Sequence, residues 1–273
     1  IIPLVAGWYA SQVFDPVVMV NPADATQLLM FVTGMAAPAG SGVMSIGLFT
    51  APIATPKVWT VVGQILLPTG TGTFDSTDVR LSSVQYVGST FYLYYTGYNA
   101  DFALGKIGLA TATVAAGPWT RHASNPILTG TGQGRNDGTG VSELSVLAES
   151  ATVWSALYAY RGAEVLPGLR AATSTDGITW TKAGAGDVIT KSPLFIEYHQ
   201  LLKIGGLYVV FYEMGNTTNR FRINVATSST LTGQFTDFAG NPILAGSTIT
   251  GTWDRWHVAT PDYVEITANS GQY

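Results

Sequence analysis

A repeated unit organises this chain of 273 residues and constrains its fold more than any other feature. Each copy contains an apolar segment, an aromatic segment ending in glycine, a segment resembling Ile-Gly-Leu-Ala-Thr, and a polar segment. Copies recur at intervals of roughly sixty residues, and a fixed period of this kind is typical of repeat architectures. The glycines that end the aromatic segments are Gly34, Gly97, Gly162 and Gly215.

Each copy has the pattern of four β-strands. Apolar and polar residues alternate with a period of two, the strands are rich in Val, Ile, Tyr, Phe and Thr, and Gly, Asn, Pro and Asp separate them. Four strands per repeat is typical of a β-propeller blade. A fifth copy begins at residues 253–266, so the sequence predicts an all-β, five-bladed propeller whose last blade is incomplete in this chain.

The copies follow one another without a linker, which predicts a single domain over residues 1–273. The first strand of each blade is expected to line a central channel, with Val84, Val146 and Leu201 in the packing between sheets. The spare apolar segment 1–10 is expected to close the ring by pairing with the fifth blade, because an unpaired sheet edge is avoided. The expected blades are residues 8–70, 71–130, 131–190, 191–246 and 247–273.

Composition excludes several classes of protein. The chain has 13 basic and 17 acidic residues, a net charge of −4 and no basic stripe, which argues against nucleic-acid binding. No apolar run is long enough for a membrane-spanning helix. The absence of cysteine excludes disulfides and thiolate chemistry. No metal-ligand spacing or cofactor-binding glycine motif is present, so we expect neither a metal nor a cofactor.

Function on a propeller is expected where the first strands converge. Asp15 in blade one and Glu143 in blade three fall at the same position of the repeat, and Glu197 in blade four lies one place earlier. Carboxyl groups brought together at the axis should include one with a raised pKa. Glycoside hydrolysis needs a carboxylic acid with a raised pKa beside an ionised carboxylate that acts as a base. The alternative is that Asp15 and Glu143 face solvent where their strands begin.

These residues resemble the five-bladed propellers of glycoside hydrolase family 43 and its relatives in families 32, 62 and 68. In that family a first-blade Asp-Pro, a third-blade Asp-Pro-Ser and a fourth-blade Glu-Gly-Pro supply the base, the pKa-modulating acid and the general acid. The resemblance implies that Asp15 is the base, Glu143 the modulator and Glu197 the acid. Glu143 replaces the family's Asp, and Glu197 lacks the following Gly-Pro.

The resemblance makes a hydrolase acting on arabinose- or xylose-type glycans, with inversion at the anomeric carbon, the first functional hypothesis. The second is a non-catalytic carbohydrate-binding propeller. Arg80, His199 and His257 are candidate substrate-binding residues. Arg80 could equally neutralise a carboxylate, and the two histidines could pack internally.

Either function makes an oligosaccharide or polysaccharide the expected partner. The chain begins without Met and ends within a strand pattern. We therefore expect either a processed chain or a fragment of a larger protein, such as a phage fibre, with other domains or chains as further partners. The expected location is extracellular, secreted or virion-associated.

Overall fold

The computed structural model describes eleven stretches of the chain, and the fold is built from these: residues 7–36, 42–99, 104–130, 138–161, 168–184, 186–190, 194–215, 220–247, 249, 252 and 258–264. Their regular structure consists of β-strands, as the alternating pattern predicts. No helix within these stretches is long and apolar enough to cross a membrane. Of the segment 1–10 predicted to close the ring, residues 1–6 lie outside the described residues, so their closure stays a prediction. Residues 7–10 form no strand, and Trp8 and Tyr9 pack against Phe49.

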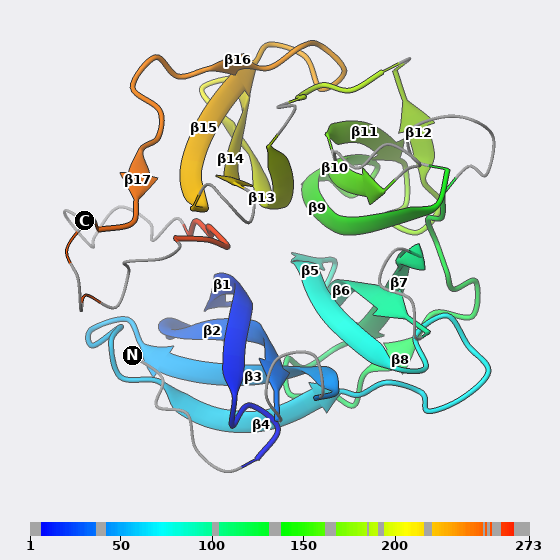
Figure 1. Ribbon diagram of the computed structural model, residues 1–273. Helices are drawn as coiled ribbons and strands as arrows, with labels where there is room; N and C mark the ends of the chain where they lie inside the picture. The colour runs from blue at the N-terminus through cyan, green and yellow to red at the C-terminus, as the bar shows by residue number, and fades with distance from the viewer. Residues whose placement is uncertain are drawn as a thin grey trace.

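Consecutive strands form antiparallel sheets, and the sheets are arranged around a centre as propeller blades (Figure 1). Blade one comprises β1 (Gln12–Asn21), β2 (Asp24–Met35), β3 (Met44–Pro52) and β4 (Thr60–Leu66). Blade two comprises β5 (Asp78–Val87), β6 (Thr90–Tyr98), β7 (Lys106–Ala112) and β8 (Thr120–Arg121).

The other two blades repeat this order. Blade three comprises β9 (Gly140–Ser150), β10 (Val153–Arg161), β11 (Leu169–Ser174) and β12 (Thr181–Ala183). Blade four comprises β13 (Phe195–Ile204), β14 (Leu207–Gly215), β15 (Arg222–Ser228) and β16 (Thr236–Asp237), with β17 (Leu244–Ala245) also paired to β15.

The apolar core lies in layers between neighbouring blades. Phe31 and Leu48 of blade one pack with Leu93 of blade two in the first layer. Two further layers join blade two to blade three and blade three to blade four. Val84, Val146 and Leu201 are buried in separate layers, which confirms their predicted place in the packing between sheets.

The described residues form four blades, where the sequence predicts five. Of the expected fifth blade, residues 258–264 are described, and they form no strand. This segment lies between β1 and blade four, in the opening of the ring (Figure 1). The Asp262 carboxylate holds it there, accepting hydrogen bonds from the Val18 amide and the Gln200 side chain, both at 2.5 Å. The period-two pattern predicts a strand, but within the described residues no second strand pairs with this segment.

Candidate functional site

A β-bulge interrupts the first strand of blades one and three where the predicted carboxylates lie. Asp15 and Pro16 together oppose one residue of β2, and Glu143 and Leu144 together oppose Tyr158 of β10. Asp15 and Glu143 have φ angles of +51° and +54°, which are uncommon for residues with a side chain. Bulges re-aim side chains near functional sites, and these two turn carboxylates into the protein.

Glu197 lies in a matching bulge of β13. The register passes from Ile196 opposite Met214 to His199 opposite Tyr212, so Glu197 and Tyr198 oppose Glu213. By strand pairing, Glu197 is therefore the first residue of its bulge, as Asp15 and Glu143 are of theirs. The alignment of the repeats, which placed Glu197 one position earlier than these two, was wrong on this point. An alignment by apolar residues misses this because it does not show where the extra residue of a bulge falls.

Blade two places a cation beside these carboxylates. Arg80 pairs with Thr96, so its place in the sheet matches that of Phe14 in blade one, which pairs with Thr33. The Arg80 guanidinium also lies over the Phe14 ring, 5.5 Å from its centroid. The residue of blade two at the carboxylate position is Leu81.

Arg80 joins Asp15 to Glu143. Its Nε and Nη2 donate to the Asp15 carboxylate at 2.5 and 3.0 Å, and its Nη1 lies 2.9 Å from Glu143 Oε1. The side chain of Arg80 is 17% exposed, that of Asp15 is 0% exposed and that of Glu143 is 5% exposed. Of the two roles considered for Arg80, the geometry is that of a cation neutralising neighbouring carboxylates.

Threonines at the ends of the second strands support the two carboxylate positions. The Thr33 hydroxyl donates to Asp15 at 3.4 Å and accepts from the Leu81 amide at 2.9 Å. The equivalent Thr96 accepts from the Glu143 amide at 3.0 Å. Blades one and two thus each help to position the first strand of the next blade.

The cluster has more acids than its cation can neutralise. Burial raises the pKa of Glu143 to about 8, against the opposing effect of Arg80 and with further elevation from Glu197, Asp15 and Glu213. Glu143 Oε2 is buried without a hydrogen-bond partner among the described residues. The sequence predicts one carboxyl with a raised pKa, and in the structure Glu143 is such a group.

Glu213 is a fourth carboxyl that the sequence reasoning missed. It lies on β14 and is 3% exposed, and burial raises its pKa to about 7. Its Oε2 accepts a 2.6 Å hydrogen bond from the Thr260 amide. The sequence contains a sign of this carboxyl. Two residues before the glycine that ends the second strand, blade one has Val32 and blade two has Tyr95, whereas blade four has Glu213.

Of the two candidate substrate-binding histidines, the structure describes His199 but not His257. His199 is 2% exposed, and its ring nitrogens face the carbonyl oxygens of Leu157 and Glu197 at 3.0 and 3.4 Å. Burial lowers the pKa of His199 to about 4, so it is neutral at pH 7, and it also lines the cavity described below. His257 lies outside the described residues.

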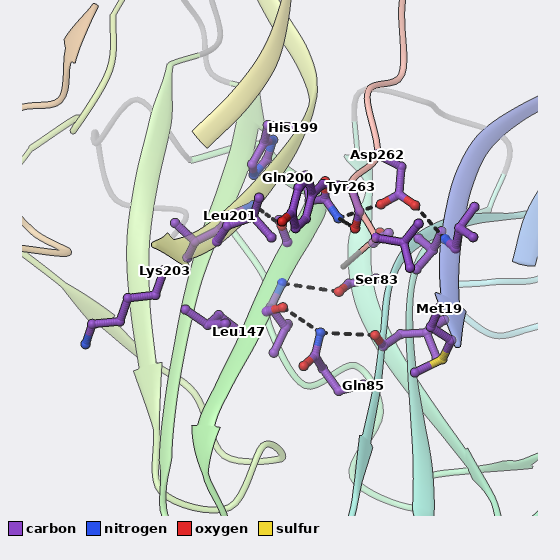
Figure 2. A pocket seen from close by; sticks show the side chains of 18 of the residues that line it. Met19, Ser83, Gln85, Leu147, His199, Gln200, Leu201, Lys203, Asp262 and Tyr263 are labelled. Atoms are coloured by element: carbon purple, nitrogen blue, oxygen red, sulfur yellow. Dashed lines mark hydrogen bonds between the residues drawn. The ribbon is translucent and has the colours of Figure 1, made fainter. Parts of the chain in front are cut away.

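A cavity of about 680 Å³ continues the channel beyond the bulges. All four first strands line it, which confirms their predicted place around a central channel. Tyr198 lines the cavity, and its hydroxyl donates to the Pro16 carbonyl at 3.0 Å, whereas Asp15, Glu143 and Glu197 are not among the lining residues. Gln200, Asp262 and Tyr263 form a hydrogen-bonded group on one wall (Figure 2).

The arrangement offers groups for proton transfer rather than for metal binding. Within the described ranges, no three or more His, Cys, Asp or Glu side chains form a group that could hold a metal ion. The cluster instead combines carboxyl groups in different environments, which is how protein sites separate an acid from a base. Glu197 differs from Asp15, Glu143 and Glu213 because it is only partly buried. The fold and the cluster together define a β-propeller with a carboxylate site near its axis.

Two curated relatives are similar to this chain. A probable arabinan endo-1,5-alpha-L-arabinosidase A of Aspergillus flavus is 31% identical over 198 residues, which cover 67% of this chain. A probable arabinan endo-1,5-alpha-L-arabinosidase C of Aspergillus niger is 28% identical over 258 residues, which cover 88% of this chain and 74% of the relative. The chain spans 58% of the length of the Aspergillus flavus relative. No family model matches the chain.

Solved structures share the fold. A glycoside hydrolase aligns with a TM-score of 0.73 at 18% identity, covering 93% of this chain and 82% of its own. A thermostable family-43 glycoside hydrolase aligns with a TM-score of 0.66 at 16% identity, covering 86% of this chain and 75% of its own. The chain therefore has an all-β propeller fold similar to that of family 43 glycoside hydrolases.

Proposed function

We propose that this protein is a glycoside hydrolase that cleaves arabinan or related pentose-containing glycans. The observation that carries the proposal is the occurrence of Asp15, Glu143 and Glu197 at matching bulges of three different blades. The similarity to two probable arabinan endo-1,5-alpha-L-arabinosidases supports the substrate class. An extracellular or virion-associated location, with other domains or chains as partners, stays part of the proposal.

In this mechanism Glu197 donates a proton to the leaving oxygen, since it is the carboxyl with access to solvent. Asp15 accepts a proton from the attacking water, and Glu143, which Arg80 joins to Asp15, takes the place of the pKa-modulating acid. Attack by water in a single displacement inverts the anomeric carbon. Arg80 holds Asp15 and Glu143 in place.

We also propose that residues 258–264 take the place of the first strand of a fifth blade in the repeat. Thr260 precedes Pro261 and has a φ of +53°, as Asp15 precedes Pro16 with a φ of +51°. The same backbone feature at a matching dipeptide supports an equivalent place in the repeat. The segment also lies in the opening between blades four and one (Figure 1).

A carbohydrate-binding propeller without catalytic activity is the second candidate. One observation favours it: Asp15 is fully buried and both of its oxygens accept from Arg80. A carboxylate held in this way must become accessible to water before it can act as a base.

Hydrolysis of linear 1,5-arabinan, followed by product chromatography, separates the two functions. The wild type should release oligosaccharides, and proton NMR of the first products should show inverted anomers. Glu197→Gln should abolish most of this release, whereas Glu149→Gln, a matched change away from the cluster, should not. Binding of arabinan without product release by the wild type would replace hydrolysis with recognition.

A further inference from the structure

We infer that Tyr198 is a positioning residue that fixes the candidate acid Glu197 relative to the candidate base Asp15, by tying the bulge of β13 to the bulge of β1. The roles of Glu197 and Asp15 are those of the proposed function, on which this inference rests. Tyr198 is 2% exposed, and its hydroxyl donates to the Pro16 carbonyl at 3.0 Å. Tyr198 directly follows Glu197, and Pro16 directly follows Asp15. One hydrogen bond therefore joins the two bulges that carry the acid and the base.

The acid and the base belong to blades on opposite sides of the opening of the ring (Figure 1). Apolar layers join blade one to two, two to three and three to four, but no apolar cluster of the described residues joins blade four to blade one. In the described part of the chain, the bond from Tyr198 to Pro16 is the only direct hydrogen bond between β13 and β1. Asp262 adds an indirect link through Val18 and Gln200. Polar contacts, rather than packing, thus set the spacing of these two bulges.

The carboxyl of Glu197 depends on its backbone for its position. Arg80 donates to both carboxylate oxygens of Asp15. Within the described residues, by contrast, no hydrogen bond reaches the Glu197 carboxyl. The bulge therefore aims Glu197, and Tyr198 is the other residue of that bulge. Loss of the contact with Pro16 should displace the acid more than the base.

Tyrosine occupies the second place of the bulge in blade four and in none of the other three described blades. Blade one has Pro16 there, blade two has Ser82 and blade three has Leu144. Pro16 and Leu144 have no side-chain donor, and the Ser82 hydroxyl bonds Thr96 within its own blade. Burial raises the pKa of Tyr198 well above its usual value, so its hydroxyl stays protonated and able to donate. The donor thus occurs where the ring lacks an apolar layer.

Tyr198→Phe removes the hydroxyl and keeps the ring, so it tests the hydrogen bond alone. On linear arabinan, kcat should fall about tenfold or more, because small displacements of a reacting group are costly. KM should stay near the wild-type value, since the change concerns the reacting groups rather than substrate binding. An aryl arabinoside with an acidic phenol should lose less than arabinan, because it depends less on the displaced acid.

Tyr94→Phe is the matched control. Tyr94 is also buried, and its hydroxyl donates to a carbonyl of another blade, that of Gly177, at 2.7 Å. It takes no part in the contacts of the carboxylate cluster. Both variants should lose a similar amount of stability in urea denaturation, but only Tyr198→Phe should lose kcat. A wild-type kcat in Tyr198→Phe, or an equal loss in Tyr94→Phe, would overturn the inference.

NMR measures the hydrogen bond without any substrate. The chain has 13 prolines, so ¹³C-carbonyl labelling of proline gives few signals, and Pro16→Ala assigns the one from Pro16. This signal should move upfield in Tyr198→Phe and stay in place in Tyr94→Phe. An unmoved signal in Tyr198→Phe would overturn the inference whatever the activity. An inactive wild type whose Pro16 signal responds to Tyr198→Phe would overturn the proposed function and keep the link between the bulges.

Discussion

The guanidinium of Arg80 holds the carboxylate of Asp15 through two nitrogens, at 2.5 and 3.0 Å, across the boundary between blades one and two. The pair is buried, and the charges of Asp15 and Glu143 raise the pKa of Arg80 well above its usual value although burial opposes them. Arg80 is therefore a permanent cation within a site rich in acids. Its removal leaves buried carboxylates without a counter-charge.

We expect Arg80→Met to lower the free energy of unfolding by about 3–5 kcal/mol, the usual cost of breaking a buried ion pair. Urea denaturation at pH 7 measures this. Arg121→Met is the comparison, because Arg121 pairs with Asp75 but is 29% exposed. The expectation is wrong if Arg80→Met is no less stable than Arg121→Met.

The stability of the protein should depend on the protonation of its buried acids. The pKa values of Glu143 and Glu213 are raised to about 8 and about 7 from 4.5. The folded state thus holds protons that the unfolded state releases, and the stability they contribute is lost as pH rises through these values. The pKa of His199 is lowered to about 4 from 6.5, so this residue makes the protein less stable as pH falls from 6.5 towards 4.

The urea midpoint of the wild type should therefore fall between about pH 6.5 and pH 8.5. Glu143→Gln cannot ionise and should flatten this fall, while Glu149→Gln should keep the wild-type slope. A wild-type midpoint that is constant or rises over this range would contradict the raised pKa values.

The acid role of Glu197 predicts a dependence on the leaving group. Glu197→Gln keeps the size of the side chain and removes the transferable proton, so turnover of arabinan should fall about 10²–10⁴-fold. An aryl arabinoside with an acidic phenol needs little protonation and should lose much less. Steady-state rates on the two substrates check this, and equal losses would mean that Glu197 is not the acid.

Asp262 should stabilise the ring by joining β1 to β13. Asp262→Ala removes the acceptor of the Val18 amide and one of the two acceptors of the Gln200 side chain, and we expect a loss of about 1–3 kcal/mol in urea denaturation. Asp262→Asn retains an acceptor for Val18, and its amide can donate to Gln200 Oε1, which has no partner among the described residues. The Asn variant should thus lose less stability than the Ala variant. The reverse order would argue against a stabilising link from Asp262 to β1 and β13.

The repeated alternation of apolar and aromatic residues was enough to predict strands, blades and the packing of Val84, Val146 and Leu201, because these depend on local periodicity and burial. It also singled out Asp15, Glu143 and Glu197, which depart from the repeat. Strand pairing decided where the bulges fall. Bulges depend on the register between two strands, which no single segment encodes.

Contacts between distant segments decided the rest. Arg80 meets Asp15 across 65 residues of chain, and Glu213 meets Thr260 across 47. The sequence shows a charge at each of these places but not its partner, since a propeller brings residues together by the angle between blades. The segment 258–264 has a strand pattern, yet whether it becomes a blade depends on tertiary pairing. Its place between blades one and four is therefore a property of the assembled ring.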